Sequence, residues 1–264
     1  MIYIVLAWFL TVATAVALGG HILRAIRLHL EGWQALIYRF LLGSAALVLI
    51  TFCLASLGLI QKGTIYAIAI VAIASSWRNW PTLPKPQFHW SAIPFSIYAI
   101  FYLTHAMAPE HSPDGMSYHL GLVARYYREH GFVWFPTNMY AFLSQGMEML
   151  FLFAYSMGRH SAAALIHFTF LLALPILLAT TAGRTGWLAG LTVFLLPVVG
   201  IDGISAYNDV ALAVTLFATW QASAKWRETQ DKAWITVAAT LAGFAIAIKF
   251  TGVIAILFLP PTLR

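Results

Sequence analysis

The chain has 264 residues, of which 61% are hydrophobic and 9% are charged. Soluble proteins carry about 25% charged residues, so this composition excludes an independent water-soluble domain and predicts an integral membrane protein. The net charge of +6 does not indicate nucleic-acid binding, because Lys and Arg are scattered singly between apolar runs. The sole cysteine, Cys53, lies in an apolar run, which excludes an internal disulfide.

Apolar runs recur along the whole chain, and crossing a bilayer takes about 20 such residues per helix. Nine runs are predicted spans: 2–22, 33–60, 63–77, 91–107, 139–157, 160–182, 186–200, 207–224 and 233–259. We therefore expect one all-α domain over residues 1–264, a polytopic transmembrane bundle of about eight or nine apolar segments.

Basic residues near span ends favour the cytoplasmic side of a membrane. Arg24, Arg27 and the Pro-rich stretch 77–90 are therefore expected inside, and the aromatic-rich segment 108–138 outside.

If every apolar run crossed the membrane, the later loops would fall on sides that disagree with the preference of basic residues for the cytoplasmic side. One apolar run is therefore expected not to cross fully. Residues 186–200 are the best candidate, because this run is short and Pro197 interrupts it. Asp209 would then return to the same side as Asp114.

The segment 108–138 contains a predicted amphipathic helix that lies along the membrane surface. Ser112, Pro113 and Asp114 form a helix-start signal, and Gly131 is expected to end the helix. Apolar residues recur on one side and arginines share the other: Met116, Leu120, Val123 and Tyr127 against Arg125 and Arg128.

Asp114 has two interpretations. An acid at this position stabilises the positive end of a helix dipole, and it could equally act as a general base toward an acceptor hydroxyl. Glu110, His111, Asp114 and His119 could also supply ligands for a divalent metal, although solvated interfacial histidines explain the same residues.

Four ionisable residues lie in or close to predicted spans, where charge is costly and pairs with a partner or has a function. They are Arg39, Glu148, Asp209 and Lys249. One interpretation is structural pairing, with Glu148 or Asp209 neutralising Lys249. The other is that Lys249 faces a cavity and binds a lipid phosphate.

Three stretches of the chain resemble motifs of one enzyme family. They are residues 114–119 (DGMSYH) with 136–140 (PTNMY) and 145–150 (QGMEML), residues 206–213 (AYNDVALA), and residues 243–252. The first set looks like the first outer loop of GT-C superfamily glycosyltransferases, and is most similar to bacterial relatives of protein mannosyltransferases and lipid A aminoarabinose transferases. The resemblance covers roughly residues 102–252.

The resemblance implies a bacterial inner-membrane enzyme that transfers a sugar from polyprenyl phosphate to an unknown acceptor at the periplasmic face, with inversion. It assigns Asp114 as catalytic base and Asp209 as the acid that helps to shape the site. Arg125 or Lys249 would stabilise the lipid phosphate as leaving group. Tyr118, His119 and Glu148 are further candidate substrate-binding residues.

Two features depart from the family pattern. About four apolar segments precede the acidic loop, and the chain is about half as long as a typical member, so we expect a divergent branch or a fragment of a longer protein. The chain contains no GxxxxGK[ST] or GxGxxG nucleotide motif.

The alternative function is a non-enzymatic membrane subunit or transporter. A transferase predicts a polar cavity between Asp114, Glu148 and Asp209 with a groove into lipid, whereas a transporter predicts a polar path across both leaflets.

Overall fold

The computed structural model describes residues 1–82, 90 and 92–260. This part of the chain is helical and contains no strand, which confirms the all-α prediction. The α-helices are α1 (Ile2–Ala25), α2 (Gly32–Ser56), α3 (Lys62–Ser76), α4 (Ala92–Ala106), α5 (Leu120–Arg128), α6 (Gly146–Leu195), α7 (Pro197–Ile204), α8 (Asp209–Thr229) and α9 (Lys232–Ile248). Short helical turns are η1 (Trp77–Asn79), η2 (Gly115–His119), η3 (Met139–Phe142) and η4 (Phe250–Phe258).

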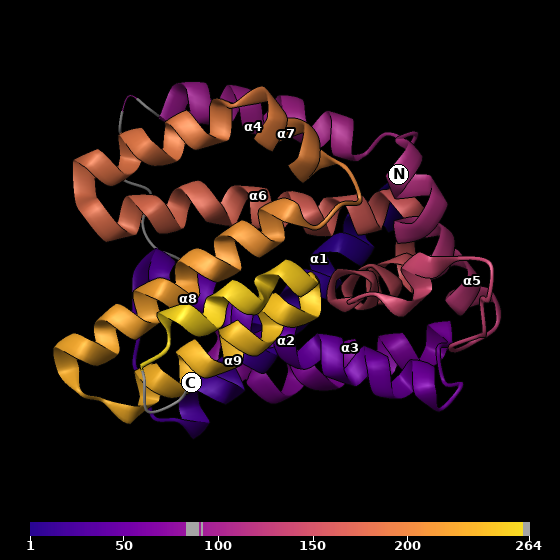
Figure 1. Cartoon of the computed structure of the whole chain (residues 1–264), viewed down its shortest axis with the longest axis horizontal. Coiled ribbons are helices and arrows are strands. Elements are labelled where there is room, and N and C mark those ends of the chain that lie inside the picture. Colours follow the sequence, from indigo (N-terminus) through magenta and orange to yellow (C-terminus); the bar gives the residue numbers. More distant parts are fainter. Residues whose placement is uncertain (83–89, 91, 261–264) are drawn as a thin grey trace.

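The helices pack as one bundle around α6, with α4 and α7 along one flank and α8 and α9 along the other (Figure 1). Aromatic rings from three helices meet in its core. Phe40 of α2 lies 4.7 Å from Phe170 of α6, and Phe170 lies 6.5 Å from Phe244 of α9, measured between ring centroids. Residues 83–89 of the basic stretch 77–90, and Ser91 of the run 91–107, lie outside the described residues.

Three described helices are long and apolar enough to cross a membrane: Ile2–Ala25, Gly32–Ser56 and Gly146–Gly183. A fourth candidate is the bent pair Thr185–Leu195 and Pro197–Ile204, and Ala92–Ala106 and Lys232–Ile248 are shorter apolar helices. These apolar helices indicate a membrane protein, while the expected eight or nine crossings stay a prediction.

The run 139–157, predicted to be one span, does not form one continuous helix. Its first residues form η3, and α6 begins only at Gly146 and bends at Arg159, where φ is 65°. Both ends of the helical part 146–158 contact the loop segment 108–138. Near its start Glu148 bonds to His119, and at its end the Arg159 guanidinium lies 4.7 Å from the Tyr127 ring.

Residues 186–200, expected not to cross fully, belong to the bent pair of helices. The chain bends by 69° at the break before Pro197, because a proline ring prevents the preceding helical hydrogen bonds. Gly186 lies against Leu178 and Gly190 against Pro175, so this segment runs back antiparallel to the second part of α6. The predicted interruption at Pro197 is present, and partial crossing stays a prediction.

The run 233–259, predicted to be one span, is divided at Lys249. α9 ends at Ile248, Lys249 is extended with φ −155° and ψ 138°, and η4 begins at Phe250. The Gly252 N–H donates to the Lys249 carbonyl (2.7 Å), and the Gly252 Cα lies against the backbone of Ala245. The chain therefore turns back here, and Lys249 stands at a helix end instead of within a span.

The predicted surface helix in 108–138 is shorter than expected. The Gly115 N–H donates to Ser112 Oγ (3.2 Å), so Ser112 does start the turn η2, but α5 ends at Arg128, before Gly131. Leu120, Leu122, Val123 and Tyr126 form the buried side of α5, whereas Met116 is exposed. Its placement on a membrane surface stays a prediction.

Small residues allow α1 and α2 to pack closely, as at many helix contacts in membranes. Gly19 lies against the backbone of Arg39, and Gly43 lies against the backbone of Ala15. A methyl group at Gly43 would overlap the Ala15 carbonyl oxygen. The two helices would then have to separate.

We expect Gly43→Ala to lower the free energy of unfolding by about 1–3 kcal/mol, because overpacking forces backbone shifts. Thermal unfolding in detergent, followed by tryptophan fluorescence, measures the change. The matched control is Gly243→Ala in α9, which faces open space and should stabilise the helix by about 0.5–1 kcal/mol. Equal melting temperatures for the two variants would contradict this account of the helix contact.

Candidate functional site

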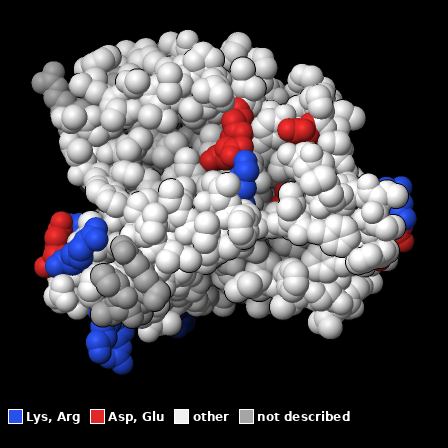
Figure 2. All heavy atoms as spheres, in the orientation of Figure 1, with Lys and Arg blue, Asp and Glu red and all other residues white. Residues whose placement is uncertain are grey.

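A cavity of about 450 Å³ opens at the end of the bundle where the loop segment 108–138 packs. Five separate stretches of chain contribute to its walls. We call it the acidic cavity. It is lined by Asp114, Tyr118, His119, Leu122, Tyr140, Leu143, Ser144, Gln145, Glu148, Asp202, Tyr207, Asn208, Asp209, Lys249, Phe250 and Thr251. Figure 2 shows sparse charge over most of this face, with one central group of acidic and basic atoms beside a hollow.

Six of the seven residues proposed from the sequence line this cavity: Asp114, Tyr118, His119, Glu148, Asp209 and Lys249. Arg125 is not among the lining residues. Its guanidinium pairs with Glu129, the residue that follows α5, at 3.1 Å, and lies 5.5 Å from the Phe135 ring. Lys249 is therefore the cation at the cavity within the described part of the chain.

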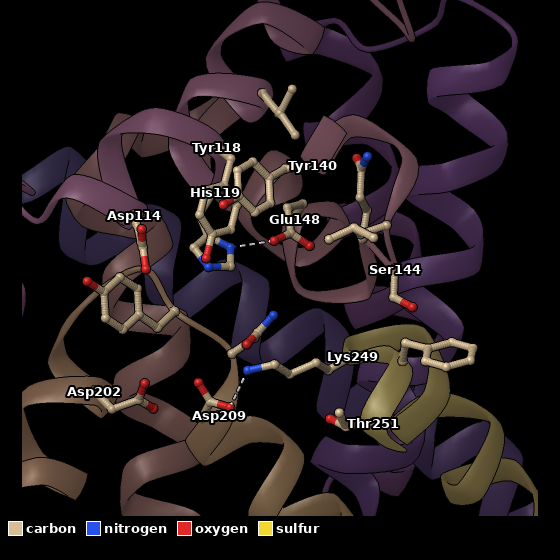
Figure 3. A pocket seen from close by; sticks show the side chains of 16 residues that line it. Asp114, Tyr118, His119, Tyr140, Ser144, Glu148, Asp202, Asp209, Lys249 and Thr251 are labelled. Atoms are coloured by element: carbon tan, nitrogen blue, oxygen red, sulfur yellow. Dashed lines mark hydrogen bonds and ion pairs between the residues drawn. The ribbon is translucent and has the colours of Figure 1, made fainter. Parts of the chain in front are cut away.

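Lys249 and Asp209 form an ion pair at the cavity wall (Figure 3). Lys249 Nζ donates to Asp209 Oδ1 at 2.5 Å, and the two side chains are 39% and 59% exposed. This is the pairing that the sequence left as one alternative. An ammonium has three donors, so two N–H groups of Lys249 can still reach a ligand.

His119 and Glu148 form a second, buried pair. His119 Nδ1 lies 2.5 Å from Glu148 Oε1, and both side chains are about 5% exposed or less. Glu148 Oε2 is buried without a hydrogen-bond partner among the described residues, and so is Gln145 Oε1 nearby in sequence. Because an unsatisfied buried acceptor costs about 1–3 kcal/mol, both oxygens suit a ligand that donates hydrogen bonds.

Asp114 stands exposed at the start of η2, and its carboxylate points into the cavity in Figure 3. No hydrogen bond from the described residues occupies this carboxylate, so it is available to a ligand. The preceding loop is fixed by Glu110, whose carboxylate accepts from the N–H groups of Ser112 (2.9 Å) and Ala206 (2.7 Å). Burial raises the pKa of Glu110, but these hydrogen bonds outweigh it and leave the pKa lowered.

Two tyrosines form an aromatic wall of the cavity. The rings of Tyr118 and Tyr140 stack with centroids 4.1 Å apart and an interplanar angle of 12°. Burial, followed by the nearby charge of Asp114, raises the pKa of Tyr118 to about 12. The Tyr118 hydroxyl thus stays protonated at neutral pH and serves as a hydrogen-bond donor.

The first turn of α8, which carries Asp209, is held by side chains from other elements. A helix N-terminus has N–H groups without intrahelical partners, and Asn208 provides no side-chain cap here. Asp202 of α7 accepts from the Val210 N–H (2.9 Å), and His167 Nε2 of α6 accepts from the Ala211 N–H (3.3 Å).

His167 is a neutral structural acceptor in this arrangement. Its Nδ1 donates to the Ser205 carbonyl (2.9 Å), which leaves Nε2 unprotonated and able to accept. His167 lies in a long apolar run, so sequence reasoning missed it. Its partners become neighbours only when α6, α7 and α8 pack together.

Four carboxylates line the cavity, yet no three His, Cys, Asp or Glu side chains of the described residues are grouped closely enough to hold a metal ion. The metal ligands considered from the sequence are dispersed. His119 is engaged by Glu148, and Glu110 by backbone N–H groups. With four carboxylates against one ammonium, an anionic ligand group fits best at the Lys249 side.

An apolar groove of about 560 Å³ adjoins the acidic cavity. It is lined by residues that include Phe52, Phe132, Trp134 and Phe142, and it shares Leu143, Ser144 and Gln145 with the cavity. A polar site and an apolar groove therefore meet along one stretch of chain.

Comparison of the chain with protein-family models, curated proteins and solved structures gives no match.

We expect Asp202→Ala to lower the free energy of unfolding by about 1 kcal/mol and to speed amide exchange at Val210, because the N–H loses its cap. Hydrogen exchange with mass spectrometry measures this. Asp231→Ala is the matched control, since Asp231 caps α9 through the Ala233 N–H (2.9 Å) away from the cavity. Unchanged exchange in α8 of the Asp202 variant would contradict the cap.

Proposed function

We propose that the chain is a GT-C-like membrane glycosyltransferase, which moves a sugar from a polyprenyl-phosphate donor to an acceptor at the outer face of a bacterial inner membrane. The observation that carries the proposal is the meeting of Asp114, Glu148, Asp209 and Lys249, far apart in sequence, at one cavity. This agrees with the cavity and groove that a transferase predicts.

The apolar groove suits the lipid chain of such a donor, and the polar cavity suits its sugar. A polyprenyl chain is apolar and fits the groove lined by Phe52, Phe132 and Trp134. The sugar carries hydroxyl donors, which fit the unpartnered oxygens of Glu148 and Gln145. The shared residues 143–145 lie where the sugar phosphate would join the lipid.

In the proposed reaction, Asp114 accepts the proton of an acceptor hydroxyl while its oxygen attacks the anomeric carbon. The bond from this carbon to the phosphate oxygen breaks, and polyprenyl phosphate leaves with the electron pair. Lys249 stabilises the negative charge that develops on the phosphate. Asp209 holds Lys249 in place at 2.5 Å.

The transporter alternative gains less support. A smaller polar cavity at the other end of the bundle shares no lining residue with the acidic cavity. The core that separates them contains Phe40, Phe170 and Phe244. An aromatic barrier of this kind disfavours a continuous polar path.

We expect Asp114→Asn to abolish release of polyprenyl phosphate from a polyprenyl-phosphate sugar, because an amide cannot accept the proton. The protein is reconstituted in bilayers with a panel of such donors, and released polyprenyl phosphate is quantified by mass spectrometry. Glu129→Gln is the matched control, because Glu129 directly follows α5 and does not line the cavity. Donor binding without release in wild type and variant alike would favour a non-catalytic protein.

We expect Lys249→Gln to reduce kcat about 10²–10³-fold with a smaller change in KM, because the lost charge acts mainly on the leaving group. Steady-state rates at several donor concentrations separate the two constants. A rise in KM alone would assign Lys249 to ground-state binding.

A further inference from the structure

A second polar cavity, of about 160 Å³, lies at the opposite end of the bundle, where α1 ends and α2 begins. Basic and apolar residues of these two helices and their connection line it. We call it the arginine pocket, and its lining residues are Gly20, Leu23, Arg24, Arg27, Leu28, His29, Leu30 and Arg39. None of these residues takes part in the proposed reaction.

The positive charge of the arginine pocket is not balanced by the protein. Its lining includes Arg24, Arg27 and Arg39 and no acid. Among the described residues, no ion pair involves any of the three. Since like charges around one small cavity repel each other, an anion in the pocket would lower its energy.

Arg39 is held between the helices in an unusual way. Its Nη1 donates to the Asn79 carbonyl (2.8 Å), while its Nε is buried without a partner among the described residues. A guanidinium has five N–H donors, and the Nε donor of Arg39 is left unsatisfied within the described part of the chain. Arg39 is only partly buried, and a guanidinium with a free N–H donor is suited to a carboxylate or phosphate.

Two adjacent glycines of α1 lie beside Arg39, one against its backbone and one against its side chain. Gly19 lies against the Arg39 backbone, and a Cβ at Gly20 would lie 3.4 Å from Arg39 Nη1. Each glycine costs a helix interior about 1 kcal/mol relative to alanine, and a side chain longer than that of alanine at Gly20 would fill the space beside the guanidinium. The orientation of a membrane protein by basic residues requires neither this enclosure nor the glycines.

The pocket lies at helix ends, where the headgroups of a bilayer spanned by α1 and α2 would be. α1 and α2 are each long and apolar enough to cross a bilayer, and the pocket lies at their connected ends. Leu23, Leu28 and Leu30 give it an apolar wall. Its volume equals that of about five waters in the liquid, enough for one phosphate group.

We propose that the arginine pocket binds a phosphate group, as carried by the headgroup of an anionic membrane lipid. The guanidiniums of Arg24, Arg27 and Arg39 donate to the phosphate oxygens, and the acyl chains lie along the apolar surface of α1 and α2. This site is independent of the proposed transferase reaction, because it lies at the other end of the bundle.

The test uses the full chain in bilayers of equal phosphatidylglycerol and phosphatidylcholine, from which co-purified lipid is identified by native mass spectrometry. Wild type should retain phosphatidylglycerol at least about tenfold over phosphatidylcholine, because each basic residue adds attraction for anionic lipid. Arg39→Gln, and separately the exposed pair Arg24→Gln with Arg27→Gln, should reduce this preference to about twofold or less. The double variant keeps the test decisive if Arg39→Gln does not fold.

A second arm distinguishes the source of the phosphate. Inorganic phosphate is added to lipid-free protein in detergent, and the melting temperature is compared with that in chloride of equal ionic strength. Stabilisation in wild type that both variants lose, without lipid preference, would assign the pocket to free phosphate. Arg128→Gln on α5 serves as control in both arms, and its loss of preference or stabilisation, or an absence of both in wild type, would overturn the proposal.

Discussion

Helix ends that lie inside an apolar bundle must find partners for their backbone N–H and C=O groups, and this requirement shapes the acidic cavity. The first turn of α8 has no cap from Asn208. Asp202 and His167, from two other helices, accept its N–H groups instead. Glu110 does the same for the Ala206 N–H in the preceding turn. These polar side chains satisfy the backbone and, by the same contacts, fix the position of Asp209 and of the loop that carries Asp114.

The charged side chains of the cavity form two pairs, and two of its carboxylate acceptors have no partner among the described residues. Asp209 neutralises Lys249, and Glu148 faces His119, so these groups are held at low electrostatic cost. The Asp114 carboxylate and Glu148 Oε2 keep their acceptor capacity among the described residues. An unpaired buried acceptor such as Glu148 Oε2 is costly, whereas the exposed Asp114 carboxylate is accessible without that cost, so both are open to the proposed ligand.

The cavities at the two ends of the bundle differ in the sign of their charge and in the surface that surrounds them. Carboxylates outnumber the ammonium of Lys249 in the acidic cavity, beside an aromatic groove. Arginines without acids line the pocket at the other end. The lipid-linked substrate proposed at one face and the anionic lipid proposed at the other are consistent with this asymmetry, because basic residues attract anionic headgroups.

The sequence by itself determined the all-α class, the membrane character and most of the charged residues at the site. Charge is so rare in an apolar chain that Glu148, Asp209 and Lys249 could be found from their positions in or close to apolar runs. Tertiary structure decided the rest. Composition cannot show that the run 233–259 turns back at Lys249, because Gly252 permits the turn only through its approach to Ala245. Nor could it identify His167, whose role exists only where three helices meet.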